Sequence, residues 1–141
     1  MKKVILIASL SMSIFTSAFS QINVGSVTNG KINQKEGLEK LIPILKSNLL
    51  ELSSLNVDYN TVKVIEFDGK YYLQFLGGSF KTTFQVTKDN SGNLIAADKV
   101  SCTTSACASE PQGCVPGLGN YCTPCANKGT CTKTVSNQSL L

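Results

Sequence analysis

The sequence predicts an α+β protein in which an N-terminal amphipathic helix packs on a four-strand antiparallel meander, followed by a small disulfide-rich C-terminal segment. Leucines recur at helical spacing between positions 38 and 52, and hydrophobic residues then alternate up to position 100. All six cysteines lie at positions 102 to 131. A helix followed by consecutive antiparallel strands is typical of a layer in which the helix covers one face of the sheet.

The first residues have the features of a secretory signal peptide. Lys2 and Lys3 form a positively charged start, an apolar run follows at positions 4–10, and small residues precede a cleavage site after Ser20. The apolar run is too short to remain in a bilayer, whose hydrocarbon core is roughly 30 Å thick. We therefore expect residues 1–20 to be removed on export, leaving a linker at 21–30 and no integral membrane span. The alternative is an N-terminal helix retained in the membrane.

The helical stripe opens the predicted domain at residues 31–100. Its apolar positions recur at spacings of three and four, as one face of an amphipathic helix requires. They are Leu38, Leu41, Ile42, Leu45, Leu49 and Leu52. Pro43 interrupts the stripe, because proline lacks the N–H that an interior helical hydrogen bond needs. It predicts either a kink in one long helix, which we favour, or the first turn of a shorter helix over residues 43–52.

A tight hairpin follows the helix. Residues 62–67 and 70–75 read as strands on either side of the dipeptide Asp68-Gly69. Asp-Gly supplies the positive φ angles of a type I′ turn, and this turn fixes the register of the flanking strands. In that register residue 62 lies opposite 75 and residue 64 lies opposite 73, so that apolar side chains share one face of the sheet.

Two more strands complete the predicted meander. Residues 80–87 alternate after a turn at Gly77-Gly78, and residues 94–100 form a weaker strand after a turn that contains Gly92. The face turned away from the helix mixes aromatic and polar side chains: Lys63, Ile65, Phe67, Tyr72 and Gln74. This face is either a binding surface or is covered by the cysteine-rich segment, and we favour the second.

The helix-then-meander order of residues 31–100 resembles the layouts of the cystatin-like and PepSY-like folds. This resemblance is one of architecture and transfers no functional residue, because a shared fold does not confer a function. An inhibitory Gln-x-Val-x-Gly motif is not present, since Asn23 stands at the valine position of the stretch at residues 21–25.

The cysteine-rich segment at residues 101–131 has many glycines and prolines and few large apolar side chains. Such a segment cannot bury enough apolar surface to offset the entropy of ordering it, whereas closing a loop of about 15 residues removes roughly 3 kcal/mol of unfolded-state freedom. An even number of cysteines in an exported chain is typical of a disulfide framework. The candidates are Cys102, Cys107, Cys114, Cys122, Cys125 and Cys131. Their pairing stays open, and residues 132–141 are expected to form a flexible tail.

Two other chemistries compete for these cysteines. Residues 122–125 have the C-x-P-C form of thioredoxin-like thiol–disulfide oxidoreductases. Those enzymes need a following helix that lowers the thiol pKa, and residues 126–129 show no helical pattern. A tetrahedral metal site with four thiolates is the other possibility, although only one C-x-x-C pair is present. Its ligands would be Cys114, Cys122, Cys125 and Cys131.

Composition argues against catalysis. The chain has no histidine, which excludes Ser-His-Asp and Cys-His arrangements within it. All basic residues are lysines, and removal of Lys2 and Lys3 lowers the net charge from +4 to +2, which is too little to predict binding to nucleic acid. We therefore expect no enzyme activity and no cofactor. The use of lysine alone, with frequent asparagine, is typical of a low-GC bacterial genome.

The leading functional hypothesis is a small non-catalytic binding module, secreted or periplasmic, with an unidentified protein or surface as its partner. Loops held on a cross-linked scaffold commonly carry recognition. The loop at residues 116–121 offers Leu118 and Tyr121 as contact residues, and the loop at 110–113 is a second candidate. The alternatives are the oxidoreductase, the metal site, and a precursor that releases its cysteine-rich end as a stable peptide.

Overall fold

A computed structural model describes residues 21–141 of the chain. The predicted signal peptide at residues 1–20 lies outside the described residues. Between residues 21 and 141, no helix combines the length and the hydropathy that a bilayer crossing requires.

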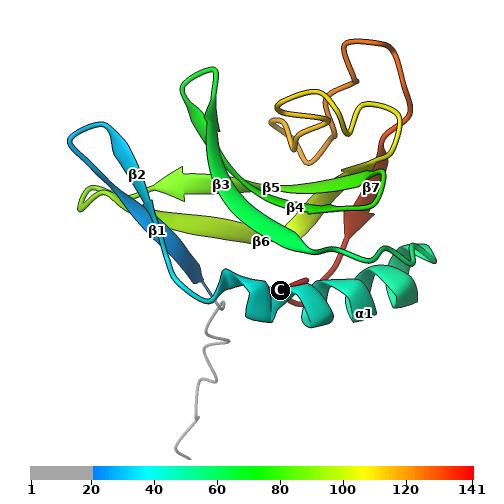
Figure 1. Cartoon of the computed structure of the whole chain (residues 1–141), viewed down its shortest axis with the longest axis horizontal. Coiled ribbons are helices and arrows are strands. Elements are labelled where there is room, and N and C mark those ends of the chain that lie inside the picture. The colour runs from blue at the N-terminus through cyan, green and yellow to red at the C-terminus, as the bar shows by residue number, and fades with distance from the viewer. Residues whose placement is uncertain (1–20) are drawn as a thin grey trace, which may run out of the picture.

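The described strands form one antiparallel sheet that curves into a nearly closed six-strand barrel (Figure 1). The strands are β1 (Ile22–Thr28), β2 (Lys31–Gln34), β3 (Thr61–Phe67), β4 (Lys70–Gly77), β5 (Phe80–Lys88), β6 (Asn93–Thr104) and β7 (Thr132–Val135). The order in the barrel is β2-β1-β6-β5-β4-β3, and β7 pairs with the second half of β6. The predicted α+β class is therefore wrong: the chain is mainly sheet, because strands before the helix extend the meander into a barrel.

Residues 21–30 contain a strand and a turn where the sequence predicted a linker. β1 and β2 form a hairpin across Asn29-Gly30, whose φ angles of 51° and 73° suit a type I′ turn. β1 then pairs with the first half of β6 on its other side. The chain therefore enters the sheet almost at once, and the predicted domain boundary at residue 31 falls inside a hairpin.

The helix is shorter than predicted and does not lie at the N-terminal end of the domain. α1 (Ile42–Ser53) follows a 3-10 turn, η1 (Leu38–Leu41), and has Pro43 in its first turn. Proline fits there because the first N–H groups of a helix have no acceptor within the helix. The favoured kinked helix is therefore wrong, and the alternative of a short helix beginning near Pro43 is confirmed. Leu45 and Leu49 on its inner side are fully buried.

The central hairpin has the predicted register. Val62 on β3 pairs with Phe75 on β4, and Val64 pairs with Leu73. Both residues of the Asp-Gly turn have positive φ, at 52° and 69°. β5 and β6 continue the meander in the expected order, so this part of the sheet follows the local turn chemistry.

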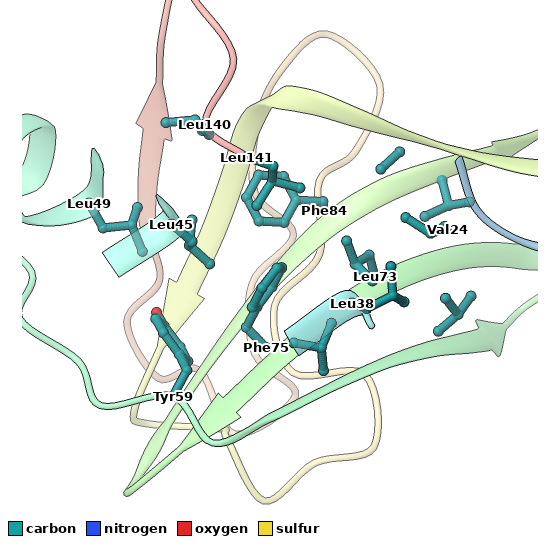
Figure 2. Packing of buried hydrophobic residues seen from close by; sticks show 14 of the residues in the cluster. Val24, Leu38, Leu45, Leu49, Tyr59, Leu73, Phe75, Phe84, Leu140 and Leu141 are labelled. Carbon is teal, nitrogen blue, oxygen red and sulfur yellow. The ribbon is translucent and has the colours of Figure 1, made fainter. Parts of the chain in front are cut away.

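An apolar core lies between α1 and the concave face of the sheet (Figure 2). Phe75 and Phe84 meet edge to face with ring centroids 5.8 Å apart, and Tyr59 packs against Phe75 at 5.9 Å. Leu140 and Leu141 return to this core and are buried. The expectation of a flexible tail at residues 132–141 is therefore corrected: β7 pairs with β6, and the last leucines fill space beside Phe84 (Figure 2).

A side chain closes the remaining gap in the barrel between β2 and β3. Gln34 Nε2 donates to the Val62 carbonyl at 3.1 Å, and Gln34 Oε1 accepts from the Val64 amide at 3.0 Å. A carboxamide carries the same donor and acceptor pair as a peptide group. Gln34 therefore takes the place of one backbone rung in the ladder between these strands.

Candidate functional site

Three disulfides cross-link the cysteine-rich segment in an interlaced order. Cys102 pairs with Cys122, Cys107 with Cys125 and Cys114 with Cys131, at Cα separations of 5.7, 5.8 and 6.2 Å. The bonds span 20, 18 and 17 residues, and each closed loop overlaps the other two. The chain is thus a small cysteine-rich module in which the segment at residues 102–131 is held by sulfur.

The C-x-P-C stretch at residues 122–125 does not form a dithiol pair of its own. Cys122 is bonded to Cys102 on β6, and Cys125 is bonded to Cys107. Residues 126–131 contain a turn followed by irregular chain, and no helix follows the motif. The four cysteines of the predicted metal site are likewise divided among all three disulfides. Both alternatives would need these structural bonds to be reduced first.

The segment is docked on the outer face of the sheet, on the side away from α1 (Figure 1). Gln74 on β4 is fully buried and donates Nε2 to the carbonyls of Pro111 and Gln112, at 3.1 and 2.9 Å. Lys81 on β5 donates its ammonium to the carbonyls of Glu110 and Pro111. These bonds hold residues 110–112 against the strands, so this loop is an anchor and less available to a partner.

The outer face is covered only in part. Tyr72 and Gln74 are buried, as the favoured expectation required, whereas Phe67 at the end of β3 is 40% exposed. The sequence did not single out Lys81, which is 3% exposed. Burial lowers the pKa of Lys81, nearby Lys63 lowers it further, and Glu110 opposes the shift. The alternation of side chains along the strand puts Lys81 on the outer face of the sheet. Lys81 is buried there because the cysteine-rich segment covers this part of the face, and the sequence pattern of the strand does not show this.

The loop at residues 115–123 is a braced hairpin. Thr123 donates its amide to the Val115 carbonyl at 2.8 Å, and Gly117 donates to the Tyr121 carbonyl at 2.7 Å. The Thr123 hydroxyl adds a bond to the same Val115 carbonyl at 3.1 Å. Cys114, directly before the loop, and Cys122, near its end, belong to two different disulfides. The backbone of this loop is therefore fixed at its base by hydrogen bonds and covalent bonds together.

The two predicted contact residues lie on this loop and face solvent. Leu118 at the tip is 81% exposed, and Tyr121 is 53% exposed. The Tyr121 ring lies against Gly117, where a Cβ would come within 2.8 Å of the ring carbon Cζ. Glycine at position 117 thus lets the ring approach the backbone. The result is an apolar tip and an aromatic side chain presented together on a rigid support.

A cavity of about 300 Å³ adjoins the same loop. It forms where β5 and β6 lose register: Phe84 pairs with Ser101 but Val86 pairs with Ala96, so residues 97–100 bulge opposite residue 85. The residues that line it are Gln21, Gln85, Thr87, Ile95, Ala96, Ala97, Asp98, Lys99, Val100, Pro116, Gly117 and Asn120. This mixture of amide, charged and small apolar groups suits a side chain of a docked partner.

Comparisons with known proteins supply no relative. No family model matches the chain, and no curated protein or solved structure matches it significantly. The features of the described chain that bear on function are the loop at residues 115–123, the disulfides that brace this loop and the cavity beside it.

Proposed function

We propose that this protein is an exported, non-catalytic binding module that recognises a protein partner through the loop at residues 115–123. The proposal rests mainly on the exposure of Leu118. This apolar side chain is 81% exposed on a loop that hydrogen bonds and disulfides hold in place beside a cavity. Leu118 and Tyr121 are the contact residues, and the cavity receives a side chain of the partner. Exposed apolar groups on a rigid support are typical of interaction sites.

The energetics favour recognition by this loop. Burying a leucine side chain contributes about 1.5–3 kcal/mol, and an aromatic ring contributes a comparable amount. A loop that is already ordered loses little conformational entropy when it binds, so more of this energy appears as affinity. The two disulfides that flank the loop thus serve binding as well as folding.

The residue composition and the disulfides support a non-catalytic role outside the reducing cytosol. The sequence has no histidine to act as a general base near neutral pH. In the described chain, the carboxylate of Asp98 at the cavity accepts a hydrogen bond from the Ser139 hydroxyl. Disulfides persist in oxidising compartments, which supports an exported protein, secreted or periplasmic.

The precursor alternative receives no support from the fold. A cut next to Lys99 would divide β6 (Asn93–Thr104), which pairs with β5 on both sides of the bulge at residues 97–100. The released piece would also take Leu140 out of the core of the remaining domain.

The test compares loop variants with a matched control on the helix. Leu118→Ala and Tyr121→Ala should each weaken capture of a partner by about tenfold, since each removes roughly 1.4 kcal/mol or more of contact energy. Leu50→Ala removes an apolar side chain of 50% exposure from α1 and should leave capture unchanged. Each immobilised protein is exposed to surface and culture extracts of its source cells, and the bound proteins are quantified by mass spectrometry. Equal capture by the loop variants and the wild type would refute the proposal.

A further inference from the structure

Two of the disulfides lie close to each other. The sulfur atoms of Cys102, Cys122 and Cys131 all lie within 4.8 Å of one another. Because Cys102 and Cys122 are bonded together, the sulfur of Cys131 lies within that distance of both atoms of a second disulfide. Thiol–disulfide exchange proceeds by attack of a thiolate on a neighbouring disulfide sulfur. The cluster therefore has the close spacing of sulfur atoms that an internal exchange requires.

Burial determines where a reductant can enter the cluster. Cys122 and Cys131 are half-buried, whereas Cys102 and Cys114 are fully buried. Each of the two disulfides thus joins a half-buried cysteine to a fully buried one. Access is one of the factors that set which sulfur is attacked.

We propose that the Cys102–Cys122 and Cys114–Cys131 bonds form a thiol–disulfide exchange site for dithiol reductants, whose product is a Cys102–Cys131 disulfide. Entry at Cys131 breaks its bond to Cys114, and the Cys131 thiolate then attacks Cys102 and displaces Cys122. Entry at Cys122 breaks its bond to Cys102, and the Cys102 thiolate then attacks Cys131 and displaces Cys114. Both routes end with Cys114 and Cys122 as thiols.

The electrons and protons balance in either route. One thiolate of the reductant forms a mixed disulfide with the entry sulfur, and the displaced cysteine leaves with the electron pair. The second thiol of the reductant then releases the entry cysteine as a thiolate and becomes oxidised to a disulfide. The internal step exchanges one disulfide for another without net redox change, and the final leaving thiolate takes a proton from water. One disulfide is thus reduced for each dithiol oxidised.

The product changes the loop that presents Leu118. Of the two cysteines that become thiols, Cys114 directly precedes this loop and Cys122 lies near its end. The new Cys102–Cys131 bond joins β6 to the residue before β7. The Cys107–Cys125 bond keeps the rest of the segment closed. Exchange therefore releases both covalent braces of the loop at once, and this regulatory consequence rests on the proposed function of the loop.

Limited reduction of the wild-type protein tests the exchange directly. The folded protein receives less than one equivalent of dithiothreitol, is quenched with acid and alkylated, and its disulfides are mapped by mass spectrometry. In most molecules that carry two alkyl groups, we expect the groups on Cys114 and Cys122 and a Cys102–Cys131 bond. Alkylation confined to Cys114 and Cys131, or to Cys102 and Cys122, shows reduction without exchange and overturns the proposal. The proposal is also overturned if the Cys107–Cys125 disulfide is the first of the three to be reduced.

Three variants test the internal step without a reductant. Cys114→Ser leaves Cys131 as a thiol and should make Cys122 reactive, and Cys122→Ser leaves Cys102 as a thiol and should make Cys114 reactive. Both variants should contain the same Cys102–Cys131 bond. Cys107→Ser is the matched control, because its free Cys125 lies outside the cluster of three sulfurs and should leave the other two disulfides unchanged. Retention of the original pairing in both test variants contradicts the proposal.

The chemistry and its link to recognition are measured separately. Disulfide mapping needs no partner, so it decides the exchange whether or not the loop is a binding site. If the exchange occurs and capture by the loop is lost with it, the regulatory consequence is supported. If the exchange occurs and capture is unchanged, that consequence is refuted.

Discussion

The barrel and the cysteine-rich segment keep their shapes by different means. The buried cluster of the barrel consists of aliphatic and aromatic side chains, among them Phe75, Phe84 and Leu140. The buried cluster of the segment consists of cysteines alone: Cys102, Cys107, Cys114 and Cys125. Apolar burial stabilises the folded state, whereas a disulfide acts mainly on the freedom of the unfolded chain. Temperature or denaturant should therefore break the barrel, and a reductant should break the segment.

This difference places the candidate binding loop in the part of the molecule that redox chemistry controls. Two disulfides brace the loop, and each of them has one half-buried cysteine. The barrel contributes the platform through Gln74 and Lys81. Substitutions in the apolar core of the barrel should therefore change global stability, while changes in the segment or in the contacts that dock it should act locally.

Phe84→Ala should have the largest effect. This side chain is fully buried between Phe75 and the end of the chain, and removing a buried phenylalanine side chain costs about 3–5 kcal/mol. Urea unfolding followed by circular dichroism should show this loss. Phe67→Ala, at a residue that is 40% exposed, is the control and should cost much less. Equal losses would mean that the core is not where the structure places it.

Leu140→Ala tests whether the end of the chain belongs to the barrel. Leu140 is fully buried, and its carbonyl accepts a hydrogen bond from Asn48 Nδ2 at 3.0 Å. Removal of a buried leucine side chain costs about 2–5 kcal/mol. The same urea titration should show this loss, while the exposed Leu50→Ala should unfold like the wild type. If Leu140→Ala unfolds at the same urea concentration as the wild type, Leu140 is not part of the core and the end of the chain is a flexible tail.

Lys81→Met should separate the two regions. Its ammonium donates to the carbonyls of Glu110 and Pro111, and losing a hydrogen bond made by a charged group costs about 1.5–3 kcal/mol. Hydrogen exchange should rise in the segment around residues 107–113 and stay unchanged in β3 and β4. Lys63→Met is the exposed control. An equal rise throughout the barrel would show that the regions are not separate.

Tyr59→Phe should have the smallest effect at neutral pH, about 1 kcal/mol. The Tyr59 hydroxyl hydrogen-bonds to Thr82, whose hydroxyl lies 2.7 Å from that of Thr103. Burial raises the pKa of Tyr59 above its ordinary value of 10.0. The folded state therefore keeps a proton that the unfolded state loses, so this contribution is complete below pH 10 and falls as the pH rises above it.

The pH dependence of unfolding gives the readout for this tyrosine. Wild-type stability should fall more steeply above pH 10 than that of Tyr59→Phe. Tyr121→Phe, at an exposed ring, should follow the wild type. Parallel curves for the wild type and Tyr59→Phe would contradict the buried position of this hydroxyl.

The sequence predicts the barrel where turn chemistry is local. Asp68-Gly69 fixed the register of β3 and β4, because two positive φ angles define the turn. Asn29-Gly30 carries the same signal for β1 and β2, but β2 has only four residues, and the core that these strands join is made mainly by residues far away in the chain. Closure of the barrel through Gln34 also depends on residues far apart in the chain, and no local sequence pattern predicts it.

The candidate site likewise has features that the local sequence predicts and features that depend on long-range contacts. Exposure of Leu118 and Tyr121 was predictable, because the segment has no apolar core in which to bury them. The disulfide pairing was not, since it depends on which cysteines the folded barrel brings together. The cavity depends on the bulge between β5 and β6, and the role of Lys81 depends on the docked segment. These features arise from contacts between distant parts of the chain.

Hydrogen exchange with and without a reductant tests the central distinction most directly. When all three disulfides are reduced, the amides of Gly117 and Thr123, which are hydrogen-bonded within the loop, should lose their protection. The amides of β4 and β5 should keep theirs, because apolar burial holds those strands. Loss of protection in both regions at the same reductant concentration would show that sulfur holds the barrel too, and would contradict the account.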